Sequence, residues 1–226
     1  GREPNVGLLG LDKIGLVPNA RGAIDTDANC RVRDHIYAVG DVTQHTALFN
    51  VAEMEGRYAI KSMYSKNPYP LRYHNMSTIM FFTPEVAVVG LNEQQCREKK
   101  IPYRMGYYSN AMVNRAIAMR RTDGFVKIMA DAKTDRVLGV AIVGPRASEL
   151  IPEAVSVMEF GGSAEDIART VHAHPTLYEG IVEAAMDAAG HAVEKRLQRS
   201  ELGIGQGAQH RLRRGGSRER LAPVAR

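Results

Sequence analysis

Several features that are common in proteins of this size are missing from the sequence, and each absence excludes a class of protein. No apolar run approaches the roughly 18 residues of a membrane-spanning helix, so no membrane association is predicted. The only two cysteines, Cys30 and Cys96, form no CxxC or CxxxxC unit. This usage argues against a disulfide framework and predicts a reducing compartment, the cytoplasm. No G-x-G-x-x-G motif opens a strand and helix, so a loop that cradles a nucleotide pyrophosphate is not predicted.

The positive charge is confined to one end of the chain. From His191 onward there are nine Lys and Arg residues and three acidic residues, a net charge of +6. Because the whole chain has a net charge of +5, the residues before His191 carry a net charge of −1. Residues 198–226 are rich in Gly and Arg and poor in large apolar residues, which predicts a disordered basic tail. A solvated tail explains these charges, and nucleic acid is not predicted as a partner. The opening run GREPN is typical of a loop between elements, so we expect further sequence before Gly1.

Hydrophobic patterning predicts a mixed α/β or α+β protein in two parts. In the first part, residues 36–39 are predicted as a buried strand of the parallel type and residues 47–63 as an amphipathic helix. The turn-rich run SKNPYPLRYHN then separates the parts. In the second part the pattern predicts a strand, a helix begun by Asn92, a hairpin, a helix, a helix begun by Ser163 and a final, longest helix. These elements span residues 85–91, 92–100, 125–143, 148–162, 163–170 and 177–196.

The stretch HAHPTLYE, residues 172–179, admits two interpretations. Thr176 and Glu179 have the spacing of a capping box that begins a helix, which explains neither histidine. Alternatively, His174 is held on a proline-fixed turn while Glu179, one helical turn further on, binds one imidazole nitrogen and leaves the other as a base. Both interpretations hold together if the Glu179 backbone lies in the helix while its side chain serves His174.

This stretch resembles the C-terminal signature of the flavin-dependent pyridine nucleotide–disulfide oxidoreductases, and among them the dihydrolipoamide dehydrogenases. In that family the histidine before Pro-Thr is the acid/base residue and a glutamate five positions later orients it, which implies these roles for His174 and Glu179. His172 has no such role and is taken as structural. Segments 114–131 and 138–151 resemble the family's interface-domain strands.

Two other motifs agree with the resemblance and imply cofactor contacts. GREPN resembles the segment that closes the family's NAD domain, which implies that Gly1 lies beside NAD. IYAVGDVT, residues 36–43, resembles the second FAD-binding motif, in which Gly40 and Asp41 would approach the flavin. The following run is implied to begin a helix whose positive end faces the flavin ring; it consists of Ala47, Leu48, Phe49 and Asn50.

The resemblance implies the C-terminal half of an FAD- and NAD-dependent dihydrolipoamide dehydrogenase. The expected division is the end of the NAD domain (1–5), the C-terminal part of the central FAD domain (6–69), an interface domain with an antiparallel sheet packed by helices (70–197) and the tail (198–226). The resemblance also implies a homodimer in which the His/Glu pair of one subunit completes the site of its partner. It further implies a small thiol or disulfide substrate and association with 2-oxoacid dehydrogenase complexes.

Two alternatives stay open at this point. The chain could belong to another member of the family, such as a glutathione reductase, a mercuric reductase or a transhydrogenase. It could instead act, as an isolated chain, as a dimerisation module without catalysis, since neither glycine-rich loops nor a redox cysteine pair is present. No metal site is predicted.

Overall fold

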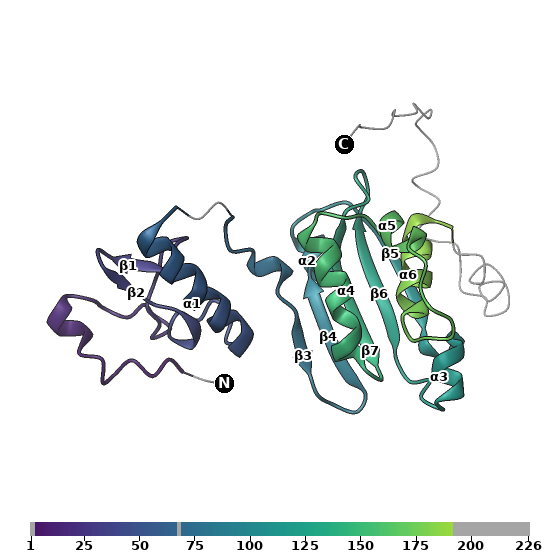
Figure 1. The fold of residues 1–226 in the computed structure, drawn as a ribbon, viewed down its shortest axis with the longest axis horizontal. Coiled ribbons are helices and arrows are strands. Elements are labelled where there is room, and N and C mark those ends of the chain that lie inside the picture. Colours follow the sequence, from purple (N-terminus) through teal and green to yellow (C-terminus); the bar gives the residue numbers. More distant parts are fainter. Residues whose placement is uncertain (1–2, 67–68, 192–226) are drawn as a thin grey trace.

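The computed structural model describes residues 3–66 and 69–191, and it places them in two parts joined by a short connection (Figure 1). Gly1 and the basic tail lie outside the described residues. The N-terminal part, residues 3–66, holds one long helix against short strands and loops. The C-terminal part, residues 69–191, holds a five-stranded sheet covered by helices. The fold class predicted from the sequence, including an antiparallel sheet packed by helices, is confirmed.

The N-terminal part is built around α1 (Phe49–Tyr64), which agrees with the predicted helix. The predicted parallel strand is wrong: β2 (Ile36–Tyr37) pairs antiparallel with β1 (Arg31–Arg33). A parallel pair needs a long crossover connection, whereas the two residues between these strands form a tight turn with His35 at a φ of 50°. Two 3-10 helices complete this part, η1 (Leu11–Ile14) and η2 (Gly40–Val42).

The sheet of the C-terminal part has the order β3-β4-β7-β6-β5, and every neighbouring pair is antiparallel. The predicted strand at 85–91 and the predicted hairpin at 125–143 are both confirmed, as β4 and as β6 with β7. The short strand β3 and the long edge strand β5 were not predicted. The strands are β3 (Thr78–Met80), β4 (Glu85–Gly90), β5 (Tyr103–Ser109), β6 (Phe125–Asp131) and β7 (Val137–Gly144).

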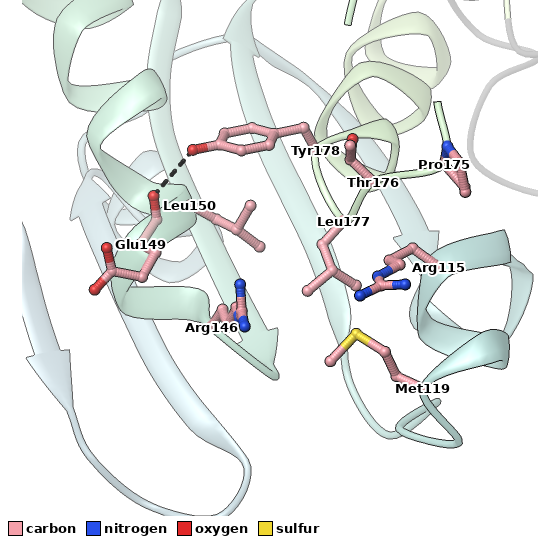
Figure 2. Close-up of a pocket in the computed structure, with 9 residues that line it drawn as sticks. All are labelled: Arg115, Met119, Arg146, Glu149, Leu150, Pro175, Thr176, Leu177 and Tyr178. Atoms are coloured by element: carbon pink, nitrogen blue, oxygen red, sulfur yellow. Dashed lines mark hydrogen bonds between the residues drawn. The ribbon is translucent and has the colours of Figure 1, made fainter. Parts of the chain in front are cut away.

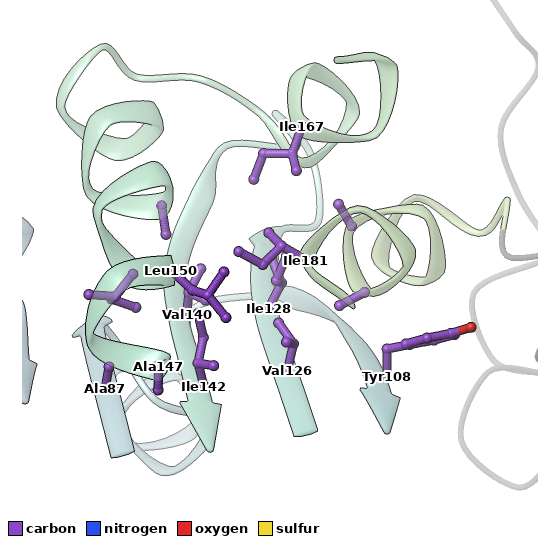
Figure 3. Packing of buried hydrophobic residues seen from close by; sticks show 14 of the residues in the cluster. Ala87, Tyr108, Val126, Ile128, Val140, Ile142, Ala147, Leu150, Ile167 and Ile181 are labelled. Carbon is purple, nitrogen blue, oxygen red and sulfur yellow. The ribbon is translucent and has the colours of Figure 1, made fainter. Parts of the chain in front are cut away.

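One face of the sheet carries the core. The strand register places Ala87, Ile142, Val126 and Tyr108 in one row across four strands, and residues in register point to the same face. All four are nearly or fully buried, and Figure 3 shows the helices lying over them. Helix α4 (Ala147–Glu159) covers β4 and β7, and α6 (Glu179–Ala189) covers β5 and β6. A single apolar face therefore fixes both helices.

Local capping signals set the beginnings of two short helices as predicted. Asn92 begins α2 (Glu93–Glu98) and Ser163 begins α5 (Ala164–Arg169), each with a complete capping box. In segment 114–131, which resembles interface strands, the first residues instead form helix α3 (Asn114–Ala118), and the strand begins only at Phe125. No helix among the described residues is both long and apolar enough to cross a membrane.

The final helix is shorter than predicted. Helix α6 ends at Ala189 because Gly190 adopts a left-handed conformation with a φ of 84°, and its amide bonds back to Asp187. Glycine at this position is a common helix terminator, because it lacks the Cβ that penalises positive φ. The predicted continuation through Gly190 is therefore wrong, residues 192–196 lie outside the described residues, and α1, at 16 residues, is longer than α6, at 11.

The connection between the two parts is held by side chains at both ends. In η3 (Tyr73–Asn75) the Tyr73 hydroxyl donates to Glu55 of α1 at 2.7 Å. The Asn75 amide donates to Glu159 of α4, also at 2.7 Å. This short segment therefore contacts both parts.

Candidate functional site

The stretch HAHPTLYE forms the turn between α5 and α6, at the sheet edge covered by α6 (Figure 1). The peptide bond between His174 and Pro175 is cis. Glu179 is the first residue of α6. The turn thus presents His174 just before a helix that is anchored to the core.

The structure brings His174 and Glu179 together. Nδ1 of His174 and Oε1 of Glu179 are 2.7 Å apart, and the side chains are 65% and 29% exposed. Burial raises the pKa of Glu179, but the hydrogen bonds from His174 and from the Thr176 amide, with the charge of His174, outweigh it and lower that pKa. An ionised carboxylate only accepts hydrogen bonds, so Nδ1 carries the proton. Nε2 of the neutral ring then has a free lone pair directed away from Glu179.

Glu179 also serves the helix, as the two interpretations together required. Its second oxygen, Oε2, accepts from the backbone amide of Thr176 at 3.0 Å, which is one half of a capping box. The other half is absent: the Thr176 hydroxyl donates to the Ala173 carbonyl at 2.7 Å, and the residue before the helix is Tyr178. The prediction that Thr176 caps the helix with its side chain is therefore wrong, because that hydroxyl is bonded to Ala173 and the helix begins only at Glu179.

His172 is tied into the fold and differs from His174 in exposure. Its side chain is 12% exposed, with Nδ1 2.8 Å from the Thr170 carbonyl and Nε2 2.6 Å from Oε1 of Glu153 on α4. Its ring stacks on Tyr178. A carbonyl only accepts, so Nδ1 of His172 carries a proton and donates it to Thr170. Sequence reasoning took His172 as structural and gave no sign of its partner.

The other predicted residues lie in the N-terminal part. Gly40 is buried and begins η2, while Asp41 is exposed. Ala47 and Leu48 precede α1, and Phe49 and Asn50 form its first, exposed turn. Figure 1 shows α1 and α6 at opposite ends of the chain, so the structure does not bring His174 near these residues within one chain.

Glu55 is a functional candidate that sequence reasoning missed. It is 1% exposed, accepts from the Gly40 amide at 2.6 Å and accepts from the Tyr73 hydroxyl at 2.7 Å. Burial, then the bond to Glu55 and its charge, raise the pKa of Tyr73, so this hydroxyl keeps its proton. A signal exists in the sequence: Glu55 lies four residues from Val51 and from Ala59, on the apolar side of the predicted helix.

The beginning of α1 is compatible with a flavin. The first turn contains no acidic residue and no side chain caps it, so its amide groups and the positive end of the helix dipole remain available to a partly anionic ring. A pocket of about 250 Å³ lies nearby, lined by Glu3, Pro4, Asp41, Gln44 and Ala47. This pocket joins the GREPN segment to the IYAVGDVT motif, which are separated by more than thirty residues in the sequence.

The cysteines are poor candidates for redox chemistry. Cys30 and Cys96 are both free and buried. Burial, followed by the charges of Glu55 and Asp27, raises the pKa of Cys30 to about 11, and burial likewise raises the pKa of Cys96. A thiol reacts as its thiolate, so neither is activated. The described part of the chain also contains no group of three or more His, Cys, Asp or Glu residues placed to hold a metal ion.

Comparison with known proteins agrees with this arrangement. Residues 76–185 match the pyridine nucleotide-disulphide oxidoreductase dimerisation domain, and residues 1–56 match the pyridine nucleotide-disulphide oxidoreductase family. Similar proteins include dihydrolipoyl dehydrogenase 3 of Haloarcula marismortui, which is 40% identical over 87% of this chain and 41% of its own length. Dihydrolipoamide dehydrogenase of Chaetomium thermophilum is 43% identical over 85% of this chain and 38% of its own length.

A solved structure is similar as well. The crystal structure of LpdA from Mycobacterium tuberculosis superimposes with a TM-score of 0.78 and 30% identity, over 83% of this chain and 41% of that one. The chain thus spans about two fifths of the length of the relatives it matches. The match to a dimerisation domain implies a homodimer. From its family matches and its fold together, the chain belongs to the pyridine nucleotide-disulphide oxidoreductase family.

Proposed function

We propose that this chain is part of a dihydrolipoamide dehydrogenase, in which His174 is the acid/base residue and Glu179 orients it. The observation that carries the proposal is the 2.7 Å contact between Nδ1 of His174 and Oε1 of Glu179 on an imidazole that is 65% exposed. The similarity to dihydrolipoamide dehydrogenases at about 40% identity supports this reaction over that of other family members.

The chemistry assigned to this pair is proton transfer from sulfur. Nε2 of His174 takes the proton of a substrate thiol, which becomes the thiolate that attacks a disulfide. The imidazolium that forms lies against an ionised Glu179, so the carboxylate stabilises the charge that the proton brings. Because Glu179 is fixed by the Thr176 amide as well, the ring is oriented before substrate arrives.

The residues of the N-terminal part are assigned to cofactors. Gly40, Asp41 and the run Ala47–Asn50 would hold FAD, which when bound would take electrons from the substrate dithiol and pass them to NAD. Gly1 is assigned to NAD and lies outside the described residues. The buried Glu55 holds the Gly40 amide and so fixes the loop that carries Asp41.

The His/Glu pair is proposed to act on the partner subunit's flavin. In one chain α6 and α1 lie far apart (Figure 1), and a two-fold dimer can bring the turn of one subunit to the flavin loop of the other. The two buried free cysteines fit a reducing compartment such as the cytoplasm. Association with 2-oxoacid dehydrogenase complexes remains part of this proposal.

The test is His174→Gln in the flavin-loaded protein that contains this chain. Turnover of dihydrolipoamide with NAD should fall about 10²–10⁴-fold, the usual contribution of a general base, while flavin content stays unchanged. His191→Gln, which changes an exposed histidine just after α6, is the matched control and should retain activity. Retention of full activity by His174→Gln would end the assignment.

The alternative is a dimerisation module without catalysis, and the short span relative to known relatives favours testing it. The 226-residue chain would then be a folded dimer that retains no flavin absorbance after incubation with FAD and removal of the unbound FAD. Stoichiometric flavin binding by this chain would reject that alternative. Glutathione disulfide with NADPH, offered in place of dihydrolipoamide with NAD, would separate the other members of the family.

A further inference from the structure

A second hollow lies beside the turn that carries His174. It has a volume of about 450 Å³, within the usual range for a site that binds a small molecule. Pro175, Thr176, Leu177 and Tyr178 form one wall, so the same turn borders both the hollow and the candidate base. Figure 2 shows that the other walls come from α3 and from the start of α4.

Two guanidinium groups face this hollow from different elements. Arg115 belongs to α3 and Arg146 directly precedes α4, and Figure 2 shows them on either side of Leu177. Within residues 3–66 and 69–191, neither side chain has an ion pair or hydrogen bond. Glu149 also borders the hollow, but Figure 2 shows its carboxylate turned away from both arginines. Two positive charges therefore border this hollow, and neither is paired with a carboxylate among the described residues.

The remaining walls are apolar. Met119, Leu150, Pro175 and Leu177 line the hollow, and Tyr178 is fixed across it because its hydroxyl donates to the Glu149 carbonyl at 3.2 Å. Guanidinium groups recognise carboxylates with two parallel hydrogen bonds, whereas the apolar walls favour a hydrocarbon body. The combination matches an organic acid with a medium-length apolar chain better than an inorganic anion or a neutral lipid.

The backbone at Arg146 adopts a conformation that suits glycine. Its φ is 58° and its ψ is 29°, the left-handed conformation that favours glycine, and no side-chain hydrogen bond compensates for it. A residue in such a conformation is disfavoured relative to glycine at the same position, so glycine is a substitution that the backbone at Arg146 tolerates. The sequence nevertheless has a long cationic side chain here, and that side chain reaches the hollow.

We propose that the hollow is a binding site for a medium-chain aliphatic carboxylate, held by Arg115 and Arg146 at its carboxylate and by Met119, Leu150 and Leu177 along its chain. The site does not depend on the function proposed above, because none of these residues belongs to the His174–Glu179 pair or to the flavin loop. A ligand there would contact the turn that presents His174, so occupancy would stiffen that turn.

The experiment measures binding of sodium octanoate to the full 226-residue chain by calorimetry, with Arg146→Gly as the decisive variant. Glycine suits the left-handed backbone, so this variant should keep or raise the melting temperature while octanoate affinity falls about tenfold or more. Arg115→Gln should weaken binding to a similar extent. Lys100→Gly is the matched control, since Lys100 is also cationic, exposed and left-handed, with a φ of 54°, but follows α2 at the opposite end of the sheet.

Several outcomes would overturn the site. Equal affinity for octanamide would remove the role of the arginines, and equal affinity for inorganic phosphate would remove the role of the apolar walls. Unchanged octanoate binding in Arg146→Gly, or an equal loss in Lys100→Gly, would contradict the assignment. Arg146→Gly could also weaken self-association of the chain, while octanoate leaves self-association unchanged. A second copy of the chain would then occupy the hollow, and the ligand site would be rejected.

Discussion

Replacing Glu179 with Gln tests the proposed mechanism most directly, because it removes one charge and leaves the size of the side chain unchanged. Both Glu179 oxygens accept hydrogen bonds, one from His174 Nδ1 at 2.7 Å and one from the Thr176 amide at 3.0 Å. A glutamine has one acceptor oxygen and one donor NH₂ group. In one orientation of the glutamine, its NH₂ group faces the Thr176 amide, so that two donors meet. In the other orientation, the NH₂ group donates to Nδ1 of His174, and the histidine proton moves to Nε2. The second arrangement removes the lone pair that the mechanism requires.

The expected size of the effect follows from this contact. A hydrogen bond between charged groups contributes about 1.5–3 kcal/mol, and it forms fully only when His174 holds the extra proton. At about 1.4 kcal/mol per factor of ten, Glu179→Gln should lower kcat about 10- to 100-fold, less than His174→Gln. The KM for dihydrolipoamide should change little, because Glu179 is not proposed to touch substrate.

The assay is steady-state oxidation of dihydrolipoamide by the flavin-loaded protein, with kcat measured from pH 5.5 to 9. Glu165→Gln on α5 is the control, since the Glu165 side chain has no hydrogen bond or ion pair among the described residues. If Glu179→Gln kept the parent kcat and pH profile while His174→Gln was inactive, Glu179 would be a helix-capping residue alone.

Three further predictions concern stability. The pKa of Glu179 is lowered in the folded state, so the stability that its charge contributes is present above its ordinary pKa of 4.5 and is lost as pH falls through the folded-state pKa. The urea midpoints of the parent and Glu179→Gln should therefore converge as pH falls below 4.5. His172→Leu should lower the free energy of unfolding by about 1–3 kcal/mol, because it leaves Glu153 without its hydrogen-bond partner. Adding Glu153→Leu to this variant should recover part of the loss. Strictly additive effects of the two substitutions would show that the two side chains are not coupled. Gly106→Ala should destabilise by at least about 1–3 kcal/mol, because a Cβ there would lie 1.8 Å from the Ala184 carbonyl of α6, and an unchanged urea midpoint would contradict that packing.

Local signals in the sequence predict much of the C-terminal part. Asn92 and Ser163 begin helices where expected, because a capping box depends on the types of only four consecutive residues. The hairpin of β6 and β7 is likewise predicted from alternation around a polar turn. The closeness of His174 and Glu179 follows from their spacing of five across a proline turn. Such features depend on neighbours in the chain, so one sequence is sufficient to predict them.

Features that depend on distant residues were missed or wrong. The edge strand β5 contains Gly106, which weakens its strand pattern in the sequence, and the structure explains this glycine by the close packing of α6 on it. The partner of residues 36–37 proved to be the segment just before them, although their apolar character indicated a parallel sheet. The bond from Glu153 to His172 spans 19 residues, and the Arg115–Arg146 hollow joins three segments. No local sequence pattern predicts these contacts between distant residues.

The buried carboxylate of Glu55 has a consequence for how the two parts of the chain communicate. It holds the loop amide of Gly40 with one oxygen and the hydroxyl of Tyr73, in the connecting segment, with the other. Any rotation of the sheet-bearing part that pulls on Tyr73 must either break that bond or displace the loop. Tyr73→Phe would remove this link between the sheet-bearing part and the Gly40 loop while leaving the bond from Glu55 to the Gly40 amide in place.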